Sequence, residues 1–182
     1  MAKSQNSQLE LIKIILDHSY IDNTGFLYEK DVANNGAIFE MKRNIICHYG
    51  IDFLLFRYDP NKVKLFPYFK ETSGLKKICD YILFAEEGKY LYLLLIELKK
   101  GTESATKQLN ASELFVKFLI DSGKRIDLQF TEHIIIKKIR VSEERARRRN
   151  RGTKIKKLEP DENGVINYDH SEVFRLKEIL DT

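Results

Sequence analysis

The stretch that decides the fold runs from Lys77 to Lys99 and reads KICDYILFAEEGKYLYLLLIELK. Two apolar runs, 77–85 and 90–99, flank the segment 86–89, in which Gly88 can adopt a positive φ. This pattern predicts a β-hairpin. The second run does not alternate between apolar and polar residues, so we expect a central strand that is covered on both faces.

The turn also predicts which residues face each other across the hairpin. If Gly88 and Lys89 are the two loop residues, counting outward from them places Asp80 opposite Glu97. Opposed residues share one face of the sheet, with Cβ atoms about 5 Å apart, and Lys99 lies on that face by strand parity. Two acids and a lysine are therefore expected to converge at the strand ends, provided that the turn keeps this register.

Such a cluster has the composition of a hydrolytic metal site. Adjacent carboxylates repel each other unless a cation lies between them, and hard oxygen ligands suit Mg²⁺ or Mn²⁺. The metal polarises a phosphoryl oxygen and lowers the pKa of a bound water. A neighbouring lysine can orient that water or neutralise charge in the transition state. The cluster predicts hydrolysis of a phosphodiester.

These residues resemble the signature of the PD-(D/E)XK nuclease superfamily. Asp80 opens one strand, and the next apolar strand ends in Glu97-Leu98-Lys99, which matches the Glu-x-Lys of the family. Cys79 departs from it, since it stands where the signature has proline. The resemblance covers about residues 36–141. It implies an α/β fold with a restriction-endonuclease-like core, in which helices flank a central mixed β-sheet, as in Holliday-junction resolvases and restriction-type nucleases.

The resemblance also implies a role for each residue of the signature. Asp80 and Glu97 would bind the metal, assisted by the backbone carbonyl of Leu98. Lys99 would be the catalytic lysine. Lys100, which points to the opposite face by strand parity, is interpreted as a surface residue or a phosphate contact.

Residues outside the signature are candidates for supporting roles. Glu40, in a stretch that resembles the first helix of the family, would be an additional or water-mediated ligand, and Glu29 competes for the same role. Gln108 would support the site from the helix after Lys99. The alternative for Glu40 is a solvated helix residue, and for Gln108 a polar group at a helix start. His48 is a further metal-ligand candidate, by resemblance to viral cap-snatching endonucleases.

The rest of the chain predicts one α/β domain with the order α-α-β-β-β-β-α-β. The helix over 102–123 is expected to pack through one apolar stripe. The other expected elements are helices over 9–18, 34–48 and 171–180, strands over 51–58 and 132–141, and a weaker edge strand over 64–69. The expected stripe consists of Leu114, Phe115, Phe118 and Leu119.

Composition sets the outer limits. The 182 residues, 43% of them hydrophobic, suit a single domain, and a net charge of only +4 does not by itself predict polyanion binding. The polar N-terminus lacks the apolar region of a signal peptide, and the longest apolar run, 90–96, is too short to span a bilayer. Cys47 and Cys79 match no zinc spacing. We therefore expect a reduced, cytoplasmic protein, although one disulfide stays an alternative.

A dense basic run follows the last predicted strand. We interpret it as an arm that contacts nucleic-acid phosphates, with a solvated charged surface as the alternative. It contains no aromatic residue, which argues against base stacking. The run comprises Arg145, Arg147, Arg148, Arg149, Arg151, Lys154, Lys156 and Lys157.

Together these patterns predict a metal-dependent endonuclease that hydrolyses nucleic acid, with DNA preferred over RNA as the partner. One alternative is a catalytically inactive nucleic-acid-binding protein on the same fold. A second is an interaction module in which Glu-x-Lys is accidental. A homodimer would supply the two sites needed to cut both strands of a duplex.

Overall fold

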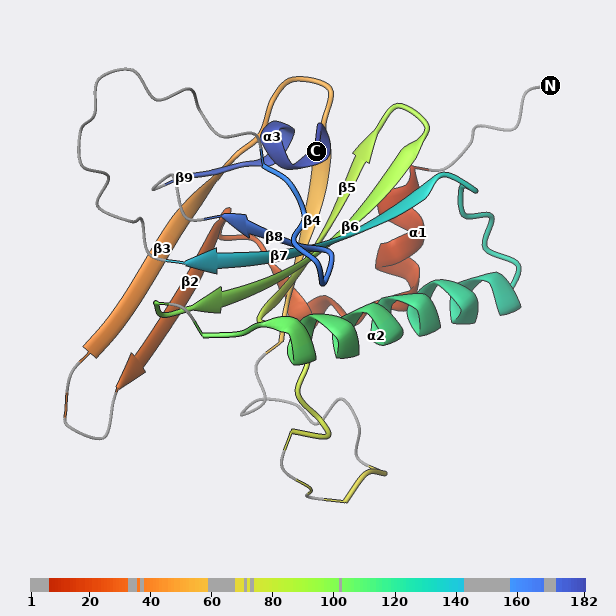
Figure 1. Ribbon diagram of the computed structural model, residues 1–182. Helices are drawn as coiled ribbons and strands as arrows, with labels where there is room; N and C mark the ends of the chain where they lie inside the picture. The colour runs from red at the N-terminus through yellow and green to blue at the C-terminus, as the bar shows by residue number, and fades with distance from the viewer. Residues whose placement is uncertain are drawn as a thin grey trace.

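A computed structural model of the chain defines thirteen helices and strands in the residues that it describes (Figure 1). It describes residues 7–32, 36, 38–58, 68–70, 72, 74–101, 103–142, 158–168 and 173–182. The elements are α1 (Gln8–Ile15), η1 (His18–Tyr20), β1 (Ile21–Asp22), β2 (Phe26–Val32), β3 (Ile38–Ile46), β4 (Asp52–Arg57), β5 (Tyr81–Glu87), β6 (Tyr90–Lys99), α2 (Thr106–Arg125), β7 (Ile134–Ser142), β8 (Val165–Tyr168), β9 (Val173–Arg175) and α3 (Leu176–Leu180).

A mixed six-stranded sheet forms the centre of the fold, in the order β1-β4-β5-β6-β7-β8. The pairs from β1 to β6 are antiparallel, whereas β6, β7 and β8 run parallel. A second, three-stranded sheet has the order β2-β3-β9. The predicted α/β class with a mixed central sheet flanked by helices is therefore confirmed.

Strand β6 is covered on both faces, as its apolar sequence predicts. Its residues from Leu91 to Leu98 are all buried. Alternate side chains pack into two separate cores. One core contains residues of α1 and α2, and the other contains residues of the second sheet and α3. The end of β6 therefore lies between two layers that can each contribute side chains to a site.

The helix predicted over 34–48 is wrong, because the residues described there form β3. Burial alternates along this strand: Phe39, Met41 and Arg43 are buried, while Glu40 and Lys42 are exposed. The sequence concealed this period of two, since the inward set includes an arginine and Ile38, Met41 and Ile45 also fit a helical spacing.

Helix α2 packs through a stripe that only partly matches the predicted one: Leu119 is buried and Phe115 packs against the core, whereas the other two predicted residues do not. Leu114 and Phe118 are 71% and 67% exposed. The helix extends two residues beyond the predicted end at Gly123. Its N-terminal residue Thr106 donates its N–H to Ser104 Oγ at 3.3 Å. The buried residues are Leu109, Ser112, Val116, Leu119, Ile120 and Gly123. A buried serine on this stripe explains why an apolar pattern misplaced it.

Several other expectations have simple outcomes. The predicted strands over 51–58 and 132–141 correspond to β4 and β7, and the first helix to α1. The predicted C-terminal helix is shorter, because β9 precedes α3 in the described part of 171–180. Most of the predicted strand 64–69 lies outside the described residues. Cys47 and Cys79 are both free. In the described part of the chain, no helix has the length and apolarity needed to cross a membrane.

Candidate functional site

The β5–β6 hairpin has the register that its turn predicts. Tyr81 pairs with Ile96 and Glu87 pairs with Tyr90, so continuing the ladder by one position brings Asp80 opposite Glu97. Two hydrogen bonds connect Asp80 to the end of β6. The Leu98 N–H donates to Asp80 Oδ2 at 2.8 Å, and the Asp80 N–H donates to Glu97 Oε2 at 3.2 Å.

Lys99 completes the cluster on the same face. Its Nζ lies 2.7 Å from Glu97 Oε1, and the two side chains are only 17% and 4% exposed. With both carboxyls ionised, one lysine charge faces two carboxylate charges in a place where little water can screen them. A bound cation would therefore reduce the excess negative charge of the cluster.

Burial controls the protonation of all three groups. Burial raises the pKa of Asp80, against the lowering effects of the Leu98 N–H and the Lys99 charge. Burial, followed by the charge of Asp80, raises the pKa of Glu97 to about 7. Burial also acts to lower the pKa of Lys99, but the hydrogen bond to Glu97 and the neighbouring acid charges raise it on balance. The lysine therefore stays cationic while the carboxyls resist ionisation.

Helix α2 positions the backbone that leads into Asp80. The N–H of Cys79 donates to Ser112 Oγ at 2.7 Å, and Ser112 Oγ donates to the Gln108 carbonyl at 2.8 Å. Both Cys79 and Ser112 are fully buried. A proline at position 79 would have no N–H to satisfy. Ser112 therefore supplies the acceptor that cysteine requires at this position.

Ser112→Ala is expected to lower the free energy of unfolding by about 1–3 kcal/mol, because the buried N–H of Cys79 loses its acceptor. It should also weaken Mg²⁺ binding, because Asp80 is the next residue. Urea denaturation and a Mg²⁺ titration measure the two effects. In a Cys79→Pro background, which lacks that N–H, the same serine substitution should cost clearly less stability. Equal costs in the two backgrounds would contradict this account.

Glu29 lies on the inward face of the second sheet, whereas Glu40 lies on its outer face. Glu40 is exposed on β3 and pairs with Lys30, whereas Glu29 pairs with Met41 and shares its inward face. The charge of Glu29 is one of those that raise the pKa of Lys99. Figure 1 shows the β2–β3 hairpin beside the arrowhead of β6. Of the two candidate acids, Glu29 is therefore the one whose charge acts on Lys99.

Tyr81 holds strand β2 against the hairpin. Its hydroxyl accepts the N–H of Tyr28 at 3.0 Å and donates to the Tyr28 carbonyl at 2.9 Å. Tyr81 is the residue after Asp80, and Tyr28 is the residue before Glu29. The two hydrogen bonds therefore fix the distance between the acids contributed by the two sheets.

The remaining predicted residues lie at different distances from the cluster. Gln108 is half-buried in the first turns of α2. Within the described residues, no hydrogen bond joins its side chain to Asp80 or Glu97. His48 is exposed in the turn after β3 and is not on a helix. The Nζ of Lys100 lies 6.0 Å from the ring centroid of Phe39, on the inner side of β3.

The predicted basic arm falls outside the part of the chain that the structure describes. This holds for all of its members, Arg145, Arg147, Arg148, Arg149, Arg151, Lys154, Lys156 and Lys157. The strand that precedes the arm is described, and its last residue, Ser142, pairs with Lys99.

Two arginines near the cluster were missed by the sequence interpretation. Arg57, at the end of β4, pairs with Tyr81, and its charge acts on Asp80. Its guanidinium lies 5.6 Å from the Tyr81 ring centroid. Arg140 is buried and donates to the carbonyls of Gly101 and Glu103, at 2.7 Å for the latter, which holds the loop between Lys99 and α2. No local pattern indicates these contacts, because both depend on strand pairing.

The donor set fits a hard divalent cation with an open coordination shell. Among the described residues, no group of three or more His, Cys, Asp or Glu side chains is arranged to hold a metal ion. Asp80 and Glu97 offer two carboxylates, and Mg²⁺ is usually held by one or two carboxylates with water and substrate phosphate. A closed structural metal centre would need more protein ligands than this pair.

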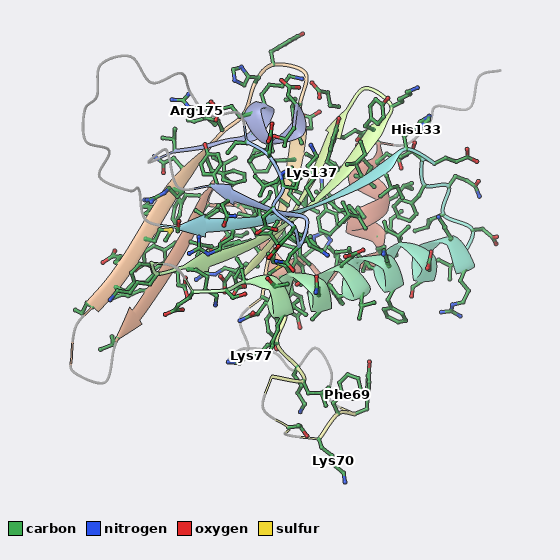
Figure 2. All side chains as sticks on the ribbon, viewed as in Figure 1. Phe69, Lys70, Lys77, His133, Lys137 and Arg175 are labelled. Atoms are coloured by element: carbon green, nitrogen blue, oxygen red, sulfur yellow. The ribbon has the colours of Figure 1, made fainter. Side chains whose placement is uncertain are left out.

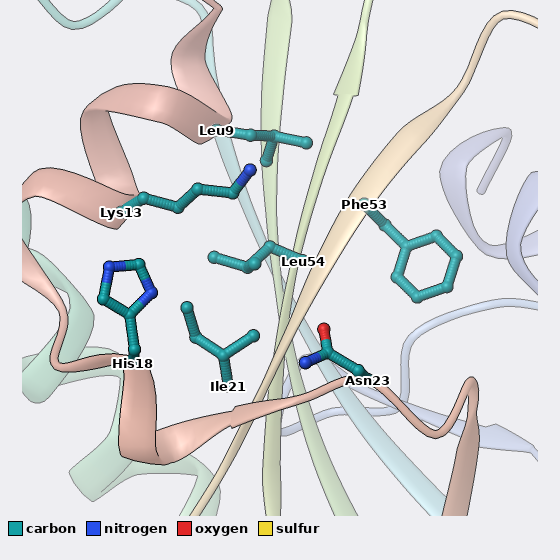
Figure 3. Close-up of a pocket in the computed structure, with 7 residues that line it drawn as sticks. All are labelled: Leu9, Lys13, His18, Ile21, Asn23, Phe53 and Leu54. Atoms are coloured by element: carbon teal, nitrogen blue, oxygen red, sulfur yellow. The ribbon is translucent and has the colours of Figure 1, made fainter.

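A pocket between α1 and β4 offers no comparable chemistry (Figure 3). Apolar side chains form most of its lining, and Lys13, His18 and Asn23 are its polar members. Its described lining contains no carboxylate, so it does not compete with the hairpin as a site for a hard cation. The lining residues are Leu9, Lys13, His18, Ile21, Asn23, Phe53 and Leu54.

Comparisons with models of protein families, with curated proteins and with solved structures gave no match. A function is therefore inferred from the residues of the site and from their geometry.

Proposed function

We propose that this protein is a Mg²⁺- or Mn²⁺-dependent nuclease of the PD-(D/E)XK type, which hydrolyses phosphodiester bonds of nucleic acid, preferentially DNA. The observation that supports this most is the convergence of Asp80, Glu97 and Lys99 at the buried end of one hairpin, with a 2.7 Å contact between lysine and glutamate. Two opposed carboxylates repel each other when both are ionised, and a bound divalent cation would relieve that repulsion.

Each residue would have a distinct role in the reaction. Asp80 and Glu97, with the Leu98 carbonyl, would hold the metal, which supplies Lewis-acid stabilisation of the phosphate when bound. Lys99 would donate hydrogen bonds to the attacking water and to a phosphate oxygen, where negative charge increases in the transition state. The Leu98 N–H keeps the Asp80 carboxylate oriented toward β6. The raised pKa of Lys99 suits this role, since the group remains a donor.

The fold supports the restriction-endonuclease-like part of the proposal. Asp80 and Glu97 belong to the antiparallel β5–β6 hairpin. Strand β7 pairs in parallel with β6, and α2 is the next element after Lys99. The basic arm begins three residues after Ser142, and Ser142 pairs with Lys99. The eight basic residues that follow this strand in the sequence would contact the phosphates of a bound strand.

The test is cleavage of a panel of substrates by the purified protein. Duplex, branched and single-stranded DNA and single-stranded RNA would each be incubated with Mg²⁺, with Mn²⁺ and with EDTA. We expect metal-dependent cleavage that EDTA abolishes. Tight, salt-sensitive binding without cleavage of any substrate would favour the inactive-binder alternative. Neither cleavage nor binding would favour an interaction module with an accidental Glu-x-Lys.

Glu29 and Glu40 were both candidates for an additional acidic residue of the site, and replacing each in turn tests which of them acts there. Glu29→Gln is expected to lower the cleavage rate about tenfold, because Glu29 is one of the acids whose charge acts on Lys99. Glu40→Gln should leave the rate unchanged within about twofold, because Glu40 is exposed on the outer face of β3. Initial rates at saturating Mg²⁺ measure both. A larger loss for Glu40→Gln than for Glu29→Gln would contradict the assignment.

A further inference from the structure

The segment that leads into Asp80 exposes two aromatic side chains. Tyr68 and Phe69 are 73% and 39% exposed. Their rings pack edge to face, with centroids 4.8 Å apart and an interplanar angle of 62°. Neighbouring exposed aromatic rings can serve as a binding surface. A ligand that packs on aromatic rings would suit the exposed part of this pair.

Positive charge accompanies this pair. Lys70 is the next residue, and Lys76 and Lys77 follow along the same segment. Lys70 and Lys77 are exposed. Among the described residues of 68–77, three are lysines and none is an acid. Glu71, the one acid of this stretch in the sequence, lies outside the description.

The segment is placed between the outside of the molecule and the proposed metal ligands. Figure 2 shows Phe69 and Lys70 at the far end of a projection away from the sheets, and Lys77 at its base. The base is connected to the sheet, since the Tyr58 N–H donates to the Asp80 carbonyl at 3.2 Å and the Tyr58 hydroxyl donates to the Lys76 carbonyl at 3.5 Å. Asp80 follows Lys77 by three residues. A strand held along the segment would therefore be led toward the cluster.

We propose that the segment before Asp80 binds single-stranded nucleic acid as it enters the site, through Tyr68, Phe69, Lys70 and Lys77. The aromatic rings would stack on bases and the lysines would contact phosphates. This proposal rests on the proposed nuclease function and makes single strands its substrate class. Aromatic faces accept unpaired bases of any identity, while lysines neutralise the phosphates between them. The bases of a duplex are already stacked on each other and would not be available to this pair. The charge is complementary to a polyanion, which disfavours an apolar peptide as the occupant.

The test compares the double variant Tyr68→Ala/Phe69→Ala with a matched control, Tyr49→Ala/Phe118→Ala. The control removes two aromatic rings that are 107% and 67% exposed elsewhere on the surface. Fluorescence anisotropy in EDTA would measure the Kd for labelled single-stranded DNA, single-stranded RNA and duplex DNA. Because these side chains are exposed, neither variant should change the thermal unfolding temperature by more than a few degrees.

We expect the Tyr68→Ala/Phe69→Ala variant to bind single strands at least about tenfold more weakly, because stacking contributes about 1–3 kcal/mol per base. Duplex affinity should stay within about twofold, and the control should match the wild type. Single-strand affinity equal to that of the wild type, or equal losses for duplex and single strand, would overturn the proposal. The measurements with single-stranded DNA and with single-stranded RNA identify which nucleic acid is preferred. A loss of affinity for either one supports the proposal.

A cleavage assay separates this inference from the nuclease proposal. If the wild type cuts and the variant still binds single strands normally, the stacking contact is refuted while the nuclease stands. If the variant loses single-strand binding but the wild type cuts nothing with Mg²⁺ or Mn²⁺, the contact is supported while the nuclease is refuted.

Discussion

Lys99→Met is expected to lower kcat for cleavage at least about a hundredfold, because the proposed reaction loses the ammonium group that lies 2.7 Å from Glu97. Mg²⁺ affinity should be retained or increased, since removing a positive charge next to Asp80 and Glu97 favours the binding of another cation. Single-turnover cleavage and a Mg²⁺ titration measure the two effects on one sample. Loss of cleavage with intact metal binding is the expected combination.

Lys100→Met provides the control for this prediction. Lys100 is adjacent in the sequence and exposed, and it lies near Phe39 instead of Glu97. We expect its replacement to change kcat less than about threefold, with a modest increase in KM if the side chain contacts phosphate. A nuclease that keeps most of its kcat without Lys99, or that loses kcat and metal binding together, would contradict the role assigned to the lysine.

The part of the site that sequence predicts is the part defined by one short turn. A two-residue loop sets the register of the whole hairpin, so counting outward from Gly88 and Lys89 was enough to bring Asp80 opposite Glu97. Lys99 then follows from strand parity alone. All three positions depend on contacts between residues that are close along the chain.

The supporting residues escaped prediction because they depend on contacts between distant segments. Ser112 bonds to Cys79 across 33 positions. Tyr81 bonds to Tyr28 across 53 positions. A serine on a helix and a tyrosine in a strand carry no local sign of such partners. Both contacts depend on how strands pair and how helices dock. The hydrophobic periodicity of a single segment does not reveal either.

The misassigned segment 34–48 has a related cause. The inward face of β3 includes Arg43, which is buried because its guanidinium donates to the carbonyls of Lys42 and Ser142 at 3.0 and 3.1 Å. A charged residue at a buried strand position breaks the apolar alternation that would have identified a strand. Strands β1, β8 and β9 have only two to four residues and are too short to show a period. Glu40 was consequently placed on a helix that does not exist.

Asp80→Asn is expected to stabilise the metal-free protein at pH 8 while abolishing cleavage. Burial raises the pKa of Asp80, and burial with the Asp80 charge raises that of Glu97 to about 7. A carboxyl whose folded pKa exceeds its unfolded value stabilises the fold below the unfolded pKa, and this contribution is lost as the pH rises through the folded pKa. Without metal, the wild type should therefore lose stability between about pH 4 and pH 7.

The substitution removes the cause of that loss without removing the hydrogen bond to β6. The amide oxygen of the introduced asparagine can still accept the Leu98 N–H, whereas its neutral group no longer opposes ionisation of Glu97. We expect a gain on the order of 2 kcal/mol over the wild type at pH 8 in EDTA, which corresponds to about 4–8 °C in Tm for a chain of this size. At pH 5 the difference should be small.

Mg²⁺ should reverse the order of stability, and this reversal distinguishes a metal site from a structural ion cluster. The proposed metal would bind the folded wild type and stabilise it by mass action, and it would bind poorly to a protein that has lost one of two carboxylates. Thermal unfolding of both proteins at pH 5 and pH 8, with EDTA and with Mg²⁺, gives the complete comparison. A cluster that serves only the fold would show the same order of stability with EDTA and with Mg²⁺. Two opposed acids that raise each other's cost of ionisation would be retained most readily for the chemistry of a cation that binds between them.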